Sequence, residues 1–152
     1  MQKLRYILLG MMVSLALIFV SCEMEEGEYT PVEFHVHESC AMRNPPNKVA
    51  KKVIYTENEF NSSFIYAVDG QPDIDPVDFT SSFVVAVCAE SSNVRRNIEI
   101  TEVLTKDYVL YVKYKINTYD KLSYKMAPCV VASISRDYSG YDIAFYDVTG
   151  ME

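Results

Sequence analysis

Hydrophobic and polar residues alternate along much of the chain beyond residue 31, and this pattern predicts β-strands. The clearest run covers residues 108–116. One face of this run is apolar or aromatic, and the other carries lysines. The first face is formed by Tyr108, Leu110, Val112, Tyr114 and Ile116, and the second contains Lys113 and Lys115. Ile98 and Ile100 begin an earlier strand. The short connection 105–107 predicts a hairpin between the two runs.

Two later regions add strands of other kinds. Residues 83–89 are apolar without alternation, which is typical of a strand that is covered on both faces. Residues 130–135 and 141–148 predict a second hairpin that turns through the polar segment 136–140.

One segment has helical rather than strand periodicity. Thr56 is followed three residues later by Glu59, which is the signature of a capping box. Apolar residues then recur at helical spacing, at Phe60, Phe64 and Ala67. We therefore expect a helix over residues 57–67, ended by the Gly- and Pro-containing segment 69–76, and we expect it to cover one face of strand 83–89.

These elements predict the fold class and the domain organisation. The expected class is α+β, mainly β: an antiparallel sandwich or partial barrel of six or seven strands with one helix packed on it. The chain has 152 residues, so a single domain over residues 32–152 is expected once an N-terminal targeting segment is set aside. A domain of this size buries enough surface to fold without a metal or a disulfide.

The N-terminus has the pattern of a signal peptide. Lys3 and Arg5 precede an uncharged, mostly apolar run at residues 7–20, which is shorter than the roughly 20 residues that a bilayer span needs. The run ends at "VSC", which resembles the lipobox of bacterial lipoproteins, in which the cysteine is acylated. We therefore expect residues 1–21 to be removed and Cys22 to carry lipid; an uncleaved anchor and plain secretion are the alternatives.

An acidic cluster follows the cysteine at Glu23, Glu25, Glu26 and Glu28. Residues 22–31 are expected to form a solvated tether. An acidic run at this position also resembles the surface-export signal of Bacteroides-type lipoproteins. The expected location is the outer membrane, by a lipid anchor, at the cell surface or facing the periplasm.

Charge and residue chemistry argue against several functions. The formal net charge is −7, so a nucleic-acid partner is not expected. His35 and His37, the two histidines of the chain, lie on the polar side of a short alternating run, and we expect both to point away from the core. With Cys40 they are candidate metal ligands, but no fourth ligand is evident, so no metal or other cofactor is expected.

The same residues bear on catalysis and on disulfides. His35 or His37 with Cys40 is the one candidate nucleophile arrangement, and no catalytic motif accompanies it, so the protein is not expected to be an enzyme. Cys40, Cys88 and Cys129 permit one disulfide in any of three pairings.

Five segments together resemble the C-terminal domain of the PrcB family, secreted lipoproteins associated with a cell-surface protease complex. They are residues 53–64, 76–87, 97–103, 108–116 and 127–148. The most specific piece is Asp78-Phe79, which leads into the apolar strand as the family's "DF" does. Where the family has a glycine-rich turn, this chain has "AESSNVRRN" at residues 89–97. The resemblance implies a β-rich domain that binds a protease.

The expected function is therefore binding of a protein partner, an exported peptidase or other envelope protein that the domain stabilises or inhibits. The candidate contacts lie in two predicted loops that a rigid sheet would present: Arg95, Arg96, Arg136, Asp137 and Tyr138. For Arg95 and Arg96 the alternative interpretation is a solvated pair.

The alternative function is a glycan-binding or cell-surface accessory lipoprotein that stacks sugars on exposed tyrosines. Tyr111 lies on the lysine-bearing face of its strand, and Tyr119 and Tyr124 lie in an expected loop. The interpretation that we favour for Tyr111 is instead that it covers a second sheet.

Overall fold

The computed structural model describes residues 28–38, 40–66 and 75–151. The expected signal peptide (1–21), the lipid-bearing Cys22 and most of the tether (22–31) lie outside these residues.

The described residues form ten strands, one α-helix and one short 3-10 helix. The strands are β1 (Thr30–Pro31), β2 (Phe34–Val36), β3 (Cys40–Met42), β4 (Ala50–Ile54), β5 (Phe64–Tyr66), β6 (Ser82–Cys88), β7 (Ser92–Lys106), β8 (Val109–Met126), β9 (Cys129–Ser135) and β10 (Asp142–Asp147). The helices are α1 (Glu57–Ser63) and η1 (Arg136–Tyr138). Within the described residues no helix combines the length and hydrophobicity that a bilayer span requires.

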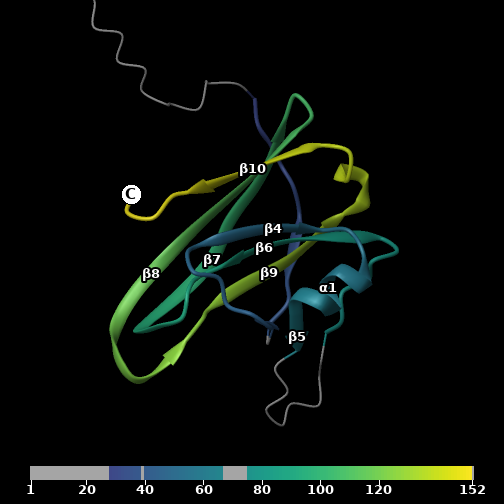
Figure 1. Ribbon diagram of the computed structural model, residues 1–152. Helices are drawn as coiled ribbons and strands as arrows, with labels where there is room; N and C mark the ends of the chain where they lie inside the picture. The colour runs from purple at the N-terminus through teal and green to yellow at the C-terminus, as the bar shows by residue number, and fades with distance from the viewer. Residues whose placement is uncertain (1–27, 39, 67–74, 152) are drawn as a thin grey trace, which may run out of the picture.

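The strands build two four-stranded sheets and one strand pair. The sheet orders are β1-β7-β8-β10 and β2-β9-β6-β4, and β3 pairs with β5. Figure 1 shows β7 and β8 crossing the other large sheet at an angle. The structure confirms a mainly β sandwich with one helix, open rather than closed into a barrel. The strand number exceeds six or seven because β1, β3 and β5 have only two or three residues, too few for a visible alternation.

Strand β6 lies at the centre of the molecule and is buried on both faces, as its continuous apolar sequence predicts. Phe83, Val85 and Val87 join the core between the two large sheets. The alternate residues Val84, Ala86 and Cys88 join a second core under helix α1. Its neighbours in the sheet are β4 and β9, both antiparallel.

Helix α1 begins as predicted but ends earlier. The Thr56 hydroxyl accepts a hydrogen bond from the Glu59 backbone N–H at 3.2 Å, and the Glu59 carboxylate accepts one from the Tyr55 N–H at 3.1 Å. The helix stops at Ser63 because Phe64 is extended and begins β5, whose backbone pairs with β3. Pairing across the chain outweighs the local helical periodicity here. Ala67 lies outside the described residues.

Strands β7 and β8 form the expected hairpin, and both are longer than predicted. The structure therefore corrects the prediction that residues 89–97 and the segment around Tyr119 and Tyr124 are loops, because residues 92–97 lie in β7 and both tyrosines lie in β8. Outward-facing lysines of β8 pair with glutamates of β7, Lys113 with Glu102 at 2.8 Å and Lys115 with Glu99 at 3.1 Å.

The predicted second hairpin is wrong. Strand β10 does not pair with β9; it runs parallel to β8 in the other large sheet. Both neighbours of β9 are already occupied, by β2 and β6, whereas β8 still offers a free edge. Helix η1 carries the chain across to that edge, so its sequence is a crossover rather than a hairpin turn.

Asp78 organises the turn that leads into β6. Its carboxylate accepts hydrogen bonds from the Thr80 backbone N–H at 2.9 Å, the Thr80 hydroxyl at 2.6 Å and the Ser81 hydroxyl at 2.7 Å. These bonds favour the charged form and lower the pKa of Asp78 from 3.8 to about 2. Phe79 follows and packs against the core under α1. The Asp-Phe pair thus combines a turn with an apolar anchor.

We expect this turn to stay intact in acid until about pH 2. A folded pKa below the unfolded value stabilises the native state above the unfolded pKa, and that contribution is lost as the pH falls through the folded pKa. The carboxyl-carbon chemical shift of Asp78, followed by NMR, should titrate at about 2. Thr80→Ala should move the titration toward the ordinary value. A titration near 3.8 in the unsubstituted chain would contradict this account.

Candidate binding surface

The turn between β7 and β8 presents an exposed tyrosine in a constrained backbone conformation. Asp107 and Tyr108 both have positive φ, at 51° and 61°. Two such residues form the type of turn that matches the twist of a hairpin, although tyrosine rarely adopts this conformation. Tyr108 is 77% exposed, so it lies in the turn and does not share the buried strand face predicted for it. The Asp142 N–H donates a hydrogen bond to the Tyr108 carbonyl oxygen at 3.1 Å, which ties the turn to the start of β10.

Tyr108 belongs to a row of three aromatic rings, which we call the tyrosine row: Tyr108, Tyr141 and Tyr138. The ring centres of Tyr108 and Tyr141 are 5.4 Å apart, and those of Tyr141 and Tyr138 are 5.3 Å apart with nearly perpendicular planes. Tyr138 and Tyr141 are partly buried against the main core. The row therefore extends from the core to an exposed tip, and it includes Tyr138, which was predicted as a contact from the sequence.

A shallow cavity of about 350 Å³ lies beside the exposed end of the tyrosine row. Tyr108 and Tyr141 line it, and charged or hydroxyl-bearing residues of the hairpin and the N-terminal strand complete it: Glu28, Thr30, Thr105, Lys106 and Asp107. The cavity thus combines aromatic faces with hydrogen-bonding groups of both charges.

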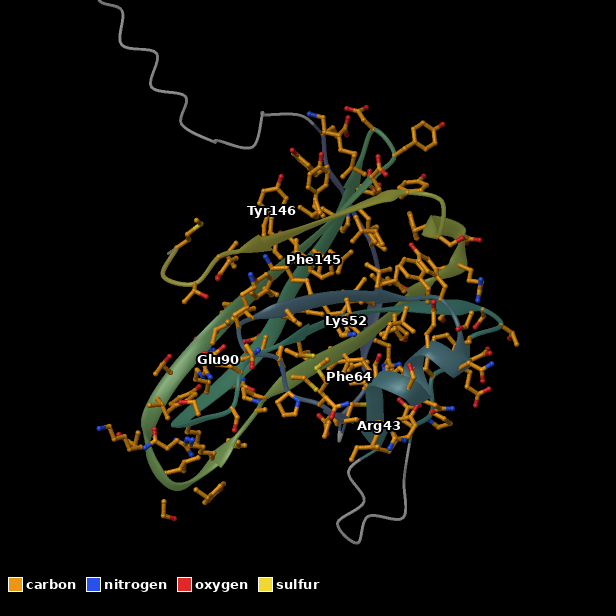
Figure 2. All side chains as sticks on the ribbon, in the orientation of Figure 1. Arg43, Lys52, Phe64, Glu90, Phe145 and Tyr146 are labelled. Atoms are coloured by element: carbon orange, nitrogen blue, oxygen red, sulfur yellow. The ribbon has the colours of Figure 1, made fainter. Side chains whose placement is uncertain are left out.

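A second aromatic cluster lies on the outer face of the β1-β7-β8-β10 sheet. Tyr111 contacts Tyr29 on one side and Tyr146 on the other, with ring centres 5.3 and 5.8 Å apart. Figure 2 shows Tyr146 on the opposite side of β10 from Phe145, which packs toward the core. Tyr111 therefore does not cover a second sheet; these two tyrosines flank it. Loss of solvent, and then proximity to Tyr29 and Tyr146, raise the pKa of Tyr111.

Arg136 and Asp137 have different roles in the structure. The Arg136 guanidinium donates hydrogen bonds to the carbonyl oxygens of Phe79 and Tyr55, at 2.9 and 2.7 Å. It joins η1 to the turn before β6 and to the end of β4. Asp137 is exposed at the surface. Arg136 is thus a structural link, and Asp137 remains available for contact beside the tyrosine row.

Arg95 and Arg96 lie on strand β7, not in a loop, and both are engaged. Arg96 forms an ion pair with Glu90 at 2.6 Å, and its side chain is only 14% exposed. Hydrogen bonding by Arg96 lowers the pKa of Glu90. The guanidinium of Arg95 lies 4.8 Å from the ring centre of Tyr119, which is a cation–π distance. The structure corrects the expectation that these two arginines lie in a loop.

The five predicted contacts do not form one surface. Figure 1 shows η1 on the opposite side of the molecule from the Ser92 end of β7, which carries the two arginines. The tyrosine row replaces them as a coherent candidate surface. Sequence reasoning missed two members of the row, Tyr108 and Tyr141. A signal exists for Tyr108 alone, because aspartate tolerates positive φ and "KDY" at residues 106–108 therefore allows a two-residue turn.

The two histidines differ in environment. His35 is exposed, as predicted, but the His37 side chain is only 3% exposed, so the expectation that both point away from the core is wrong for His37. Its Nε2 lies 2.8 Å from the Ser133 hydroxyl oxygen, and its Nδ1 lies 3.0 Å from the backbone oxygen of Asp75. Nδ1 also lies 3.6 Å from the Asp75 carboxylate, which contacts His35 directly. Hydrogen bonding to His35 lowers the pKa of Asp75.

The three described cysteines lie together beneath helix α1, and all are free thiols. Cys88 and Cys129 are opposite each other on β6 and β9, and the Cys129 thiol donates to the Cys40 carbonyl oxygen at 3.1 Å. Burial, and then proximity to Cys129, raise the pKa of Cys40 to about 12. The adjacent Cys88 thiol, and then burial, also raise the pKa of Cys129. The sequence leaves three disulfide pairings open. Of these, the structure places only Cys88 and Cys129 directly opposite each other on neighbouring strands.

Comparisons of the chain with protein-family models, with curated proteins and with solved structures found no match. The resemblance to the PrcB family therefore stays a prediction.

Proposed function

We propose that this chain is a lipid-anchored lipoprotein of the bacterial outer membrane whose β-rich domain binds a protein partner, an exported peptidase that it stabilises or inhibits. The role is binding rather than catalysis. The N-terminal pattern that ends at Cys22 supports the anchor, and the segments that resemble the PrcB family support the class of partner.

The tyrosine row is the observation that carries the binding role. Tyr108 is 77% exposed, yet its backbone is fixed by a tight turn and a hydrogen bond to β10. Tyrosine supplies a large amphipathic contact area at little cost in side-chain entropy, and it is enriched among the residues that dominate binding energy. A ring held in advance at an exposed tip loses little freedom when a partner covers it.

The surroundings of the tyrosine row suit a protein partner. Asp137 and Tyr138 lie in η1, next to Tyr141, and Asp107 and Lys106 flank Tyr108. An aromatic centre with charged groups at its edge is the usual composition of a transient protein interface. Arg95 and Arg96 are not part of this surface, since each already has an intramolecular partner.

Site-specific crosslinking tests this proposal. A photoreactive amino acid placed at Tyr108 or Tyr138 of the full chain, in its own cells, should capture the same peptidase. The same group at Tyr124, which is exposed near the far end of β8, is the matched control and should not capture it. Tyr108→Ala should weaken binding of the purified peptidase about 30-fold, as for truncation of a residue at the centre of an interface.

The activity and lifetime of the captured peptidase then separate its inhibition from its stabilisation. Capture from Tyr124 but not from Tyr108, or unchanged affinity of the Tyr108→Ala chain, would contradict the tyrosine row as the binding surface. Recovery of glycan alone would contradict the protein partner.

The cavity beside Tyr108 favours one alternative function, binding of a glycan. Aromatic faces stack on sugar rings, and the cavity also presents carboxylates and hydroxyls for sugar hydroxyl groups. Titration of the chain with cell-surface glycans would then change the fluorescence of its tyrosines, and Tyr141→Ala would abolish the change while Tyr124→Ala would not.

A further inference from the structure

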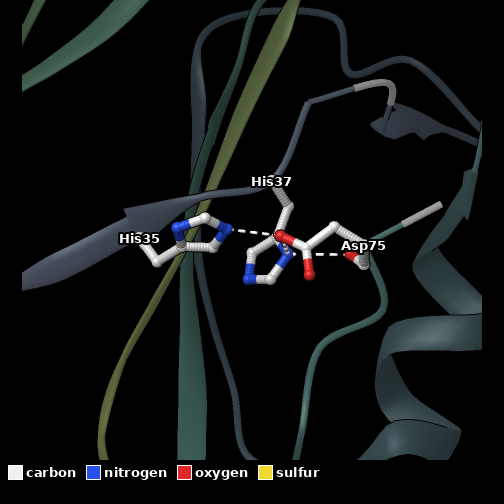
Figure 3. A group of neighbouring side chains, drawn as sticks. All are labelled: His35, His37 and Asp75. Atoms are coloured by element: carbon white, nitrogen blue, oxygen red, sulfur yellow. Dashed lines mark hydrogen bonds and ion pairs between the residues drawn. The ribbon is translucent and has the colours of Figure 1, made fainter. Parts of the chain in front are cut away.

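The fold brings together three potential metal ligands, His35, His37 and Asp75 (Figure 3). One nitrogen of each imidazole and one oxygen of the carboxylate lie within 4.8 Å of one another. His35 and His37 come from β2 and the residue after it, and Asp75 comes from a segment almost 40 residues later in the chain. No sequence motif links Asp75 to the two histidines, because only the fold brings it to β2.

We propose that these three residues form a binding site for a divalent transition-metal ion of the zinc type. Two imidazole nitrogens and one carboxylate oxygen are a donor set that zinc accepts with a fourth position left for water or another ligand. Oxygen-only donor sets suit magnesium and calcium, whereas imidazole favours zinc and its neighbours.

The distances fit this assignment. Zinc bonds of about 2.0–2.2 Å place neighbouring ligand atoms of a tetrahedral site roughly 3.4 Å apart. His37 Nδ1 and the Asp75 carboxylate oxygen are 3.6 Å apart. His35 touches the same oxygen and must move away slightly to admit an ion, which it is free to do because its side chain is 64% exposed. The two imidazole planes are nearly perpendicular, at 86°, so both rings can direct a nitrogen toward one point.

The partner of His37 Nε2 suits the ring to act as a metal ligand through Nδ1. A ligand histidine donates its second ring N–H to a nearby acceptor, which fixes the tautomer and the ring orientation. The Ser133 hydroxyl lies 2.8 Å from His37 Nε2 and can accept that hydrogen. The Asp75 backbone oxygen can only accept, so its contact with Nδ1 places a hydrogen on Nδ1 in the absence of metal. A metal ion would displace that hydrogen and take the Nδ1 lone pair, while the hydrogen on Nε2 is donated to Ser133. Ser133 lies on β9, which pairs with β2, so the acceptor is positioned by the sheet itself.

The free thiols are the competing ligands within the described chain, and they are distinguishable. Cys40 does not belong to the three-residue group; its thiol lies in the cluster under α1. Cobalt(II) reports its own ligands, because thiolate coordination adds intense near-ultraviolet charge-transfer bands that nitrogen and oxygen ligands do not produce.

Metal binding to the purified full chain tests the site. Equilibrium dialysis with zinc should give one bound ion per chain, and cobalt(II) should give visible bands without thiolate charge transfer. His35→Ala and Asp75→Asn should each weaken zinc binding at least tenfold, and Ser133→Ala should weaken it roughly 10- to 100-fold through the loss of the second hydrogen bond. Glu33→Gln, which removes an exposed charge on the same segment, is the matched control and should leave the affinity unchanged.

Thermal unfolding keeps the test independent of folding defects in a variant. Zinc should raise the melting temperature of the unsubstituted chain and of Glu33→Gln, but not of His35→Ala, whose substitution is at an exposed position. Absence of bound zinc, thiolate bands with cobalt, or equal affinities of the unsubstituted and His35→Ala chains would overturn the proposal.

Discussion

Replacing Phe60 by alanine is expected to lower the free energy of unfolding by about 3–5 kcal/mol, the range for loss of a buried aromatic side chain. Phe60 is 1% exposed and is the buried residue of α1. Its ring centre lies 5.2 Å from that of Phe64, 5.5 Å from that of Tyr66 and 5.8 Å from that of Phe79. The substitution therefore leaves a cavity between the helix and β6. Chemical denaturation followed by circular dichroism measures the change.

Asn58→Ala in the same helix is the control for this substitution. Asn58 is exposed, so its replacement should alter the free energy of unfolding by no more than about 0.5 kcal/mol. A loss below about 1 kcal/mol for Phe60→Ala would mean that α1 does not cover β6 in solution.

A second large effect is expected on the opposite face of β6, where Val85→Asp should prevent folding at neutral pH. Val85 is 0% exposed and lies between Val53 of β4 and Ala132 of β9. A carboxylate there has no partner and loses its hydration, and the penalty is comparable with the whole stability of a domain, about 5–15 kcal/mol. Loss of the near-ultraviolet circular dichroism of the tyrosines would report the unfolding.

The pH dependence identifies the buried charge as the cause. Burial raises the folded pKa of the introduced carboxyl group above its unfolded value, so the neutral form favours folding and the stability is lost as the pH rises. Val85→Asn has the same shape without a charge. The Asp variant should approach the Asn variant in stability near pH 3 and fall below it as the pH increases. Equal stabilities of the two variants at pH 7 would show that charge is not the cause.

The sequence predicts the elements of this fold better than their pairing. The buried strand β6 and the first turn of α1 follow from local signals, namely an unbroken apolar run and the Thr56–Glu59 cap. Strand pairing depends on which sheet edges remain free, and no local signal encodes that. Strand β10 therefore looks like the second arm of a hairpin with β9 although it pairs with β8.

The candidate surface was less predictable than the fold. A polar turn in the sequence predicts Tyr138 as a contact residue, but its role in the candidate surface derives from contact with Tyr141, which depends on how η1 crosses the sandwich. Arg96 has the composition of a contact residue, but its ion pair with Glu90 accounts for it. Asp75 reaches the histidines only through the fold. Side-chain chemistry is visible in a sequence, but the availability of a side chain is a property of its neighbours.

The pairing of β1 with β7 sets a limit on where the domain can act. Thr30 lies opposite Thr105, near the turn that carries Tyr108, so the chain enters the domain at the same end as the tyrosine row. Eight residue steps separate Cys22 from Thr30, and a fully extended chain spans at most about 28 Å over that length. With the proposed acyl group at Cys22, the tyrosine row would work within a short reach of the bilayer. Its partner would have to come to the membrane surface, and a peptidase that is itself held there would meet it most often.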